Sequence, residues 1–323
     1  MKLLVTGGAG YIGSTVATLL VEQGHEVVVL DDLSTGHAGA VPPGARLVRG
    51  RVHDVIGDVL TADFDGVLHF AAFIAAGESV HRPERYWENN VIGSLRLLDA
   101  VRAAGVPRLV FSSTANVYGD PTQLPITETA VAAPPNPYAT SKLAVEHALT
   151  GETTAHGLAA VSLRYFNAAG ALLRPGGSSC GERHDPETHL IPIALQVAAG
   201  HREKLPIYGD DYPTPDGTCV RDYIHVADLA AAHLLALGAV APGEHRVYNL
   251  GNGTGFSNRE VVDVVREVTG HPIPTEMGPR RAGDPAVLVA SAARAHEELG
   301  WVPARTSLPD IVADAWAFAR TTN

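Results

Sequence analysis

The stretch Lys2-Leu3-Leu4-Val5-Thr6-Gly7-Gly8-Ala9-Gly10-Tyr11-Ile12-Gly13 decides the fold. A short apolar strand pattern runs directly into glycines at positions 7, 10 and 13, and a helical pattern over 11–23 follows. Glycines at this spacing allow a tight turn and bring backbone N–H groups close to a pyrophosphate, while the helix N-terminus adds the positive end of its dipole. The stretch therefore predicts a dinucleotide-binding strand–loop–helix unit.

An acidic residue stands where such a unit needs one. Asp31 ends the second predicted strand, 18 residues beyond Gly13. A carboxylate at this place accepts hydrogen bonds from the adenosine ribose hydroxyls and repels a 2′-phosphate. The pattern favours NAD over NADP. It also favours a cofactor site over the alternative, an ordinary tight turn with an Asp at the end of the next strand.

Short β-branched runs alternate with helical patterns through the first half of the chain. This alternation predicts an α/β fold with a doubly wound parallel (Rossmann) sheet covered by helices on both faces. The predicted strands cover 2–6, 26–31, 46–48, 66–70, 108–112 and 159–164, and the predicted helices cover 11–23, 83–104 and 138–155.

The second half is less regular and predicts a smaller C-terminal α/β domain that binds the substrate. Its predicted helices lie at 191–199, 226–237, 258–269 and 308–318, after a Gly-, Pro- and Ser-rich loop over 171–186. We expect residues 1–165 to form the cofactor domain and 166–323 the substrate domain. Segments around 223–250 are expected to pack back on the first domain.

Composition excludes several partner classes. The 24 basic and 35 acidic residues give a net charge of -11, and no Lys/Arg cluster suggests a nucleic-acid partner. No apolar run approaches the roughly 18 residues of a membrane span. Two cysteines cannot form a disulfide framework, so a cytoplasmic location is expected. The histidines, His184 and His189 among them, show no paired spacing with acids, and no metal site is predicted.

Candidate catalytic groups follow the fifth strand and begin the third long helix. Tyr138 lies in the predicted first turn, and Lys142 lies four residues on, hence on the same helix face. Because a tyrosine has a pKa near 10, it needs a nearby ammonium and the helix N-terminus to act as a base near neutrality. Thr114, after the fifth strand, can pass a proton between substrate and Tyr138. Each of these residue types is also common on solvated helices and turns. The glycine loop strengthens the interpretation that the three residues together form a catalytic group.

These residues carry a resemblance to the extended short-chain dehydrogenase/reductase family and, within it, to nucleotide-sugar 4-epimerases. The likeness covers nearly the whole chain. Its further motifs are His69-Phe70-Ala71-Ala72, Gly77-Glu78-Ser79-Val80, Asn89-Asn90-Val91, Arg164-Tyr165-Phe166-Asn167, Tyr212-Pro213-Thr214 to Asp216-Gly217-Thr218, Val220-Arg221-Asp222-Tyr223-Ile224-His225-Val226 and Arg280-Arg281-Ala282-Gly283-Asp284.

The resemblance implies roles for individual residues. Tyr138 matches the catalytic base, Lys142 its activator and nicotinamide-ribose contact, and Thr114 the proton shuttle and a substrate contact. The remaining implied NAD contacts are Gly7, Gly10, Tyr11, Ile12, Gly13, Asp31, Asp32, Leu33, Ser34, Thr35, Gly36, Arg51, Val52, Phe70, Ala71, Ala72, Ile74, Asn89, Ser112 and Phe166. The implied substrate contacts are Asn167, His189, Leu190, Pro206, Ile207, Tyr208, Arg221, Tyr223, Arg281, Asp284 and Leu288.

Four places depart from the family pattern. Arg51 stands where many members have an Asp that contacts adenine, and we hypothesise that Arg51 stacks on or skirts the adenine. Ile74 replaces a Lys found near the pyrophosphate in some members, and His189 replaces an Asn. The loop over 171–182 is longer than usual. None of these changes touches Tyr138 or Lys142.

The implied reaction is the redox-neutral interconversion of UDP-galactose and UDP-glucose through a 4-keto sugar, with NAD oxidising C4 and returning hydride to the opposite face. Dehydratases and decarboxylases usually carry acids where Ala115 and Asn116 stand, and uronic-acid 4-epimerases usually carry Thr where Asn167 stands. A non-catalytic NAD-binding module is expected to lose Tyr138 or Lys142. UDP-glucuronate and UDP-GlcNAc remain alternative substrates.

Two further expectations come from the resemblance alone. Leu288 matches a gate that is small in enzymes accepting UDP-GlcNAc, so a preference for UDP-glucose and UDP-galactose is expected. A homodimer is expected to form through the helices over 83–104 and 138–155.

Overall fold

A seven-stranded sheet forms the centre of the molecule, for which a computed structural model describes residues 1–174, 179–281 and 284–321. Its strand order is β12-β6-β5-β4-β1-β2-β3, and all neighbouring pairs are parallel. This is the order of a doubly wound sheet, which confirms the predicted fold class. The strands are β1 (Lys2–Thr6), β2 (Glu26–Asp31), β3 (Arg46–Arg49), β4 (Gly66–His69), β5 (Arg108–Thr114), β6 (Ala159–Tyr165) and β12 (His245–Leu250).

Successive residues of the buried strands enter different cores, because side chains alternate across a sheet. In β1, Leu3 and Val5 belong to one buried cluster, whereas Leu4 belongs to the other. The same alternation holds in β2, where Val29 faces the first cluster and Leu30 the second. Strands that are apolar on both faces thus require helices on both sides of the sheet.

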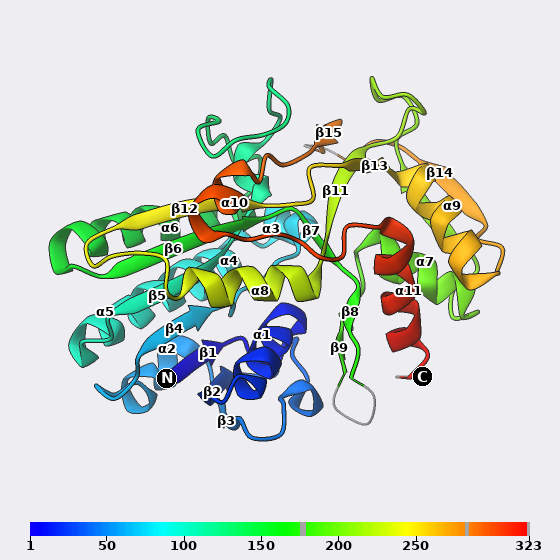
Figure 1. Cartoon of the computed structure of the whole chain (residues 1–323). Helices are drawn as coiled ribbons and strands as arrows, with labels where there is room; N and C mark the ends of the chain where they lie inside the picture. The colour runs from blue at the N-terminus through cyan, green and yellow to red at the C-terminus, as the bar shows by residue number, and fades with distance from the viewer. Residues whose placement is uncertain (175–178, 282–283, 322–323) are drawn as a thin grey trace.

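The two faces are covered by different sets of helices. One face carries α1 (Tyr11–Glu22), α8 (Val226–Ala236) and α10 (Ala293–Leu299). The other carries α2 (Val52–Val59), α5 (Gly93–Ala104) and α6 (Pro137–His156). Figure 1 shows α8 lying beside α1, although the two helices are more than 200 residues apart in the chain. Elements of the second half, β12 among them, therefore complete the central sheet and its cover.

A second core lies to the right in Figure 1. Its helices are α7 (Leu190–Ala198), α9 (Asn258–Thr269) and α11 (Leu308–Ala319), and β10 (Leu205–Tyr208) pairs with β14 (Thr275–Gly278) beside them. A four-stranded sheet is built around β11 (Val220–His225), which pairs with β7 (Asn167–Ala169), β13 (Gly255–Ser257) and β15 (Val287–Leu288). Because β7 follows β6 almost directly, this sheet starts at the carboxyl end of β6.

Some elements differ from the sequence-based expectation. The predicted helix over 83–104 is divided into α4 (Pro83–Tyr86), a π-helical segment η2 (Trp87–Ile92) and α5. The sequence patterns did not predict β12, α2, α3 (Ala76–His81) or α10, because each element is short or partly exposed to solvent. The loop over 171–186 contains a small hairpin of β8 (Ala171–Leu172) and β9 (Cys180–Gly181), and its residues 175–178 lie outside the described part. Short 3-10 turns, η1 (Ala38–Ala40) and η3 (Ala115–Tyr118), complete the set.

The sequence predicted no membrane-spanning helix. Among the described residues, no helix combines the length and the apolar character that crossing a bilayer would need.

The contact of Gly13 with the glycine loop generates a stability prediction. A Cβ at Gly13 would lie 2.2 Å from the carbonyl oxygen of Gly7, which is backbone and cannot yield cheaply. Gly13→Ala is therefore expected to lower the free energy of unfolding by about 1–3 kcal/mol or more, as overpacking does. Urea denaturation followed by circular dichroism measures it.

Gly151→Ala is the matched control, because Gly151 lies on exposed turns of α6 where a Cβ meets no described atom within 4 Å. This change should raise stability by about 0.5–1 kcal/mol. Equal stabilities of the two variants would contradict the proposed tight packing of the loop.

Candidate active site

The glycine loop joins the carboxyl end of β1 to α1. Gly7 has φ +70, and a Cβ there would lie 2.5 Å from the backbone nitrogen of Ala71, which follows β4. Gly10 is the N-cap of α1, and no side chain of the described residues caps this helix start. The uncapped N–H groups and the positive end of the helix dipole thus meet the requirements for binding a pyrophosphate.

The Asp31 carboxylate closes the turn after β2. Its Oδ2 accepts the N–H of Ala9 at 3.0 Å, and its Oδ1 accepts the N–H of Leu33 at 2.8 Å. Burial raises the pKa of Asp31, and these two backbone hydrogen bonds oppose the rise. Because a carboxylate has about four lone-pair sites, two acceptor positions remain for ribose hydroxyls. The geometry fits the cofactor predicted from the sequence.

Other predicted cofactor residues surround these two turns. Phe70 and Ala71 donate their N–H groups to the Thr6 carbonyl, at 2.9 and 3.1 Å, so the segment after β4 lies against the end of β1. Arg51 is exposed, with its Nε 3.9 Å from Oδ2 of Asp32. Its adenine contact stays a prediction. The other members of the predicted set are partly buried Tyr11, Ile12, Leu33, Gly36 and Ala72, buried Val52, and exposed Ser34, Thr35 and Ile74.

Helix α6 begins so that Tyr138 lies at the end of β5. The Asn136 side chain caps the helix by accepting the N–H of Ala139 at 2.9 Å, and Pro137 occupies the first turn. Tyr138 is buried, and burial raises its pKa, while a hydrogen bond with Thr114 lowers it. Thr114 is the last residue of β5. The structure thus brings together the two hydroxyl groups that the sequence singled out.

Lys142 lies one turn further along α6 and contacts β5. Its Nζ donates to the carbonyl of Ser112 at 2.8 Å and lies 5.0 Å from the centre of the Phe111 ring. The side chain is 2 % exposed, and burial lowers the pKa of its ammonium to about 7. A lysine with this pKa can exchange its proton near neutrality.

The π-helical segment η2 places a buried amide beside the active site. Asn90 accepts the N–H of Phe73 at 2.9 Å and donates to its carbonyl at 3.0 Å. The same amide donates to the Ser141 hydroxyl of α6 at 3.0 Å. Asn89, the predicted cofactor contact, is partly buried and donates to Asn90 Oδ1 at 3.1 Å. Asn90 therefore fixes the segment after β4 relative to α6, a role that its place in the sequence did not reveal.

A buried ion pair lies behind Tyr138 and Lys142. Glu146, one turn beyond Lys142, accepts two hydrogen bonds from the Arg164 guanidinium of β6, at 3.0 and 2.6 Å. The same carboxylate accepts the Ser113 hydroxyl at 2.5 Å. Arg164 also donates to the Tyr118 hydroxyl at 2.8 Å. Sequence reasoning did not assign this network, because Glu146 and Arg164 are separated in the chain and meet only in the folded sheet.

The residues implied to contact the substrate lie mainly on the small sheet. Asn167 in β7 is paired with Tyr223 in β11, and Arg221 in β11 is paired with Leu288 in β15. The Arg221 side chain is 11% exposed, and its Nη2 lies 4.0 Å from Oδ1 of Asp284. The register places these residues on adjacent strands.

Leu288 belongs to a buried cluster that also contains Phe166 and Ala115. The predicted sugar gate thus lies close to the turn that follows Thr114.

The remaining predicted substrate residues belong to the second core. Arg281 lies over the ring of Tyr208 in β10, 4.1 Å from its centre, and Pro206 and Ile207 precede Tyr208 in the same strand. His189 is the N-cap of α7, and Leu190 is its first residue. Ala282 and Gly283 of the Arg280–Asp284 motif lie outside the described residues.

Comparison with known proteins decides the family. The sequence profile described as "NAD dependent epimerase/dehydratase family" matches residues 3–251. The chain belongs to this family. The match spans the glycine loop, Asp31, Thr114, Tyr138 and Lys142.

Relatives within the family are similar over nearly their whole length. The chain is 62% identical to the UDP-glucose 4-epimerase of Streptomyces lividans over 321 residues, which cover 98% of this chain and 95% of the relative. It is 57% identical to that of Corynebacterium glutamicum over 319 residues, again 98% and 95%. The crystal structure of UDP-glucose 4-epimerase from Bifidobacterium longum, in complex with NAD+ and UDP, is 37% identical and superposes with a TM-score of 0.92, covering 100% of this chain and 99% of that one.

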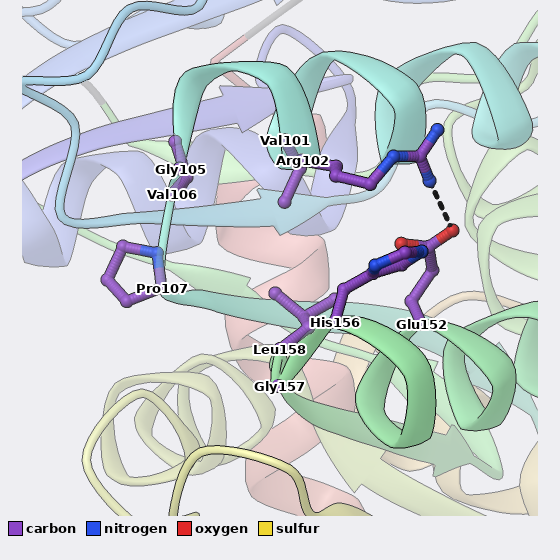
Figure 2. A pocket seen from close by; sticks show the side chains of 9 residues that line it. All are labelled: Val101, Arg102, Gly105, Val106, Pro107, Glu152, His156, Gly157 and Leu158. Carbon is purple, nitrogen blue, oxygen red and sulfur yellow. Dashed lines mark hydrogen bonds and ion pairs between the residues drawn. The ribbon is translucent and has the colours of Figure 1, made fainter.

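A small surface hollow lies at the opposite end of the central sheet (Figure 2). It is formed where α5 and α6 end and β5 and β6 begin, and an Arg102 to Glu152 ion pair of 2.7 Å crosses it. The glycine loop and Thr114 lie at the carboxyl ends of the strands, so this hollow is distinct from the candidate active site. It is lined by Val101, Arg102, Gly105, Val106, Pro107, Glu152, His156, Gly157 and Leu158.

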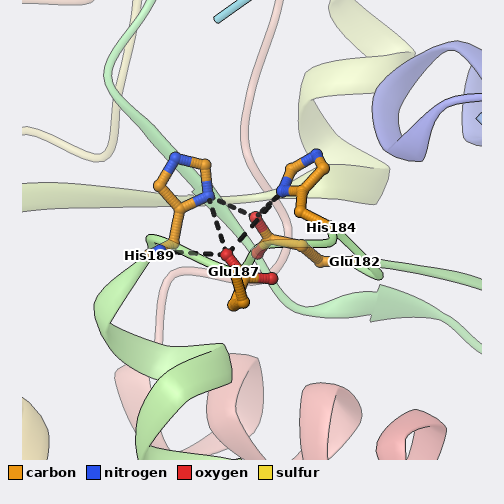
Figure 3. A group of neighbouring side chains, drawn as sticks. All are labelled: Glu182, His184, Glu187 and His189. Carbon is orange, nitrogen blue, oxygen red and sulfur yellow. Dashed lines mark hydrogen bonds and ion pairs between the residues drawn. The ribbon is translucent and has the colours of Figure 1, made fainter. Parts of the chain in front are cut away.

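The sequence-based interpretation that His184 and His189 have no acidic residues paired with them is wrong. Glu182, His184, Glu187 and His189 have their potential ligand atoms within 4.8 Å of one another (Figure 3). The spacing Glu-x-His-x-x-Glu-x-His was visible in the sequence, but the acids were not paired with the histidines because the segment has no regular periodicity. The loop before α7 folds back on itself and brings the four side chains together.

The buried ion pair generates a second stability prediction. Glu146→Gln leaves the Arg164 guanidinium buried without a counter-charge, so the free energy of unfolding should fall by about 3–5 kcal/mol. Urea denaturation measures it. The matched control is Asp263→Asn, which removes an exposed partner of Arg266 and should leave the denaturation midpoint nearly unchanged. A Glu146→Gln midpoint equal to that of the control would show that the buried pair does not hold α6 in place.

Proposed function

We propose that the protein is an NAD-dependent UDP-glucose 4-epimerase that interconverts UDP-galactose and UDP-glucose. The observation that carries the proposal is the placement of Tyr138 and Lys142 on one helix, with Tyr138 beside Thr114 at the carboxyl end of β5. That edge of the sheet also holds the dinucleotide-binding glycine loop. The similarity over nearly the full length to the UDP-glucose 4-epimerases of Streptomyces lividans and Corynebacterium glutamicum supports the choice of reaction.

The cofactor would be held by the glycine loop and by Asp31, the two features whose geometry fits it. The uncapped start of α1 would bind the pyrophosphate, and Asp31 would bind the adenosine ribose. When bound, NAD supplies the acceptor and then the donor of the hydride at C4 of the sugar. Lys142, fixed by the Ser112 carbonyl, would contact the nicotinamide ribose.

Proton transfer would belong to the chain's own residues. Tyr138 acts as general base on the sugar 4-hydroxyl, directly or through Thr114. Burial raises the pKa of Tyr138, so the phenolate needs stabilisation by nearby groups before it can act as a base. The helix N-terminus and, in its protonated form, Lys142 on the same helix face both favour the phenolate. Returning the proton from Tyr138 restores the hydroxyl after the hydride has come back.

The second core and the small sheet would hold the UDP moiety. Arg221 and Arg281 carry guanidinium groups, which match the geometry of a pyrophosphate. Asn167 and the β10 strand would contact the rest of the nucleotide. Anchoring UDP in this way leaves the hexose free to turn and present its other face to the cofactor. Neither Ala115 nor Asn116 offers the carboxylate that an elimination would need.

Tyr138→Phe tests the assignment of the base. The variant should lower kcat for conversion of UDP-galactose to UDP-glucose by about 10²–10⁴-fold or more, since it removes a general base. Chromatography of the nucleotide sugars measures turnover, and the NAD content of the denatured protein shows whether cofactor binding survives.

Tyr248→Phe serves as the control. Tyr248 lies in the edge strand β12, which β6 separates from β5, and its hydroxyl donates to Glu298. It should keep the wild-type rate. If wild-type protein supplied with NAD converts no UDP-galactose, the proposed function is wrong. If Tyr138→Phe is fully active, the base is another group.

Leu288 generates a prediction on the sugar range. Its buried side chain, packed with Phe166 and Ala115, should crowd an N-acetyl group. Leu288→Ala is expected to raise kcat/KM for UDP-GlcNAc relative to UDP-galactose, measured by competition in one mixture. The conservative variant Leu288→Met should not raise this ratio. Wild-type protein that accepts both sugars equally would contradict the gate.

We also propose a homodimer in the cytoplasm. The helical stretch 83–104 exposes three large apolar side chains, Trp87, Ile92 and Leu95, which are 41–43% exposed. Both cysteines in the described structure are free thiols, as is usual for cytoplasmic proteins. Leu95→Glu is expected to convert a dimer of about twice the 33.9 kDa chain mass into monomers, by light scattering. A monomeric wild type would contradict the dimer.

A further inference from the structure

Four potential metal ligands lie within eight residues, between β9 and the first turn of α7. Glu182 and Glu187 each offer a carboxylate, and His184 and His189 each offer the Nδ1 of an imidazole (Figure 3). Neither the NAD site nor the proposed epimerase reaction assigns them a common role.

The four ligand atoms lie within 4.8 Å of one another. His184 Nδ1 lies 3.0 Å from Oε1 of Glu182, and His189 Nδ1 contacts that same oxygen. Oε1 of Glu187 faces both rings, 3.8 Å from His184 Nδ1 and 3.9 Å from His189 Nδ1. Four ligands around zinc at about 2.0–2.2 Å stand about 3.3–3.6 Å apart. On binding the ion, the two Glu182 contacts would therefore lengthen and the two Glu187 contacts would shorten.

Burial of the carboxylates requires a nearby positive charge. The Glu182 and Glu187 side chains are only 7% and 4% exposed. Two protonated histidines could provide the charge, but the rings lie 5.5 Å apart and would repel each other. Both rings direct Nδ1 at the same Glu182 oxygen, and both also face Oε1 of Glu187. A single divalent cation between neutral imidazoles balances both carboxylates without this repulsion.

Surrounding groups fix the orientation of the ligands. Oε1 of Glu187 accepts the backbone N–H groups of Thr188 and His189, at 2.7 and 2.9 Å, so these bonds hold the carboxylate in place and leave Oε2 as its oxygen with acceptor capacity for an ion. The carbonyl of Arg183, between two ligands, contacts Nε2 of His37 at 2.9 Å. Outer hydrogen bonds of this kind orient ligands at metal sites.

We propose that Glu182, His184, Glu187 and His189 form a structural site for a divalent transition metal, zinc in the first place. Mixed imidazole and carboxylate ligands suit zinc, and a site closed by four protein ligands is structural rather than catalytic. The ion would fix the loop against the start of α7, where His189 and Leu190 are predicted to contact the substrate.

Metal content of the untagged, full-length protein tests the proposal. After dialysis against metal-free buffer, mass spectrometry of the elements should find about one zinc per chain. Protein stripped with dipicolinate should bind one equivalent of Co²⁺ with the visible absorption of a tetrahedral site, and its Tm should rise when Zn²⁺ is returned. These readouts do not depend on epimerase activity, so the site can fail while the proposed reaction stands.

Two variants and one control assign the ligands. His184→Gln and Glu187→Gln should each lose the bound zinc and the Co²⁺ absorption, while the exposed His201→Gln should keep both. If either ligand variant does not fold, the Co²⁺ titration of stripped wild-type protein decides alone. Wild-type protein with no zinc and no saturable Co²⁺ binding would overturn the proposal in favour of plain ion pairs. Variants that bind metal as wild type does would overturn the ligand set.

Discussion

The buried ion pair between Glu146 and Arg164 is the interaction on which the candidate active site depends. It joins α6 to β6, and through the Ser113 hydroxyl it joins the same helix to β5. Lys142 and Tyr138 lie one and two turns before Glu146 on α6, respectively, so their positions follow from this attachment. A charge pair buried to this degree is costly unless its hydrogen bonds are satisfied, and here several described partners satisfy it. The network fixes the position of α6 relative to the end of β5.

The order of the strands explains why the site is where it is. In a doubly wound sheet, ligands bind at the carboxyl ends of the strands where the chain reverses its direction of winding, here between β1 and β4. The glycine loop follows β1, Asp31 ends β2, and Thr114 ends β5, so one edge of the sheet gathers groups for the cofactor and for the proton. The small sheet begins directly after β6, and it brings Arg221 and Leu288 from the second half of the chain.

Much of this arrangement could be predicted from the sequence, for reasons that differ between residues. The glycine loop, Asp31 and the Tyr138–Lys142 spacing are local patterns, because neighbouring residues form each of them. The roles of Asn90, Glu146 and Arg164 were not predicted, although two of them lie in the quoted motifs, because their partners lie on other segments of the chain. β12 escaped because its outer residues are half exposed at a sheet edge, and the cluster of Glu182, His184, Glu187 and His189 because an irregular loop brings it together.

Transient oxidation at C4 is the central claim, and an isotope tests it most directly. UDP-galactose that carries deuterium in place of hydrogen on C4 would be converted in ordinary water, and the UDP-glucose formed would be analysed by NMR and mass spectrometry. If the hydrogen leaves with its electron pair, is held out of contact with water and returns to the same carbon, the product keeps its deuterium at C4. Loss of the deuterium to solvent would mean that C4 is deprotonated instead, and would contradict the account.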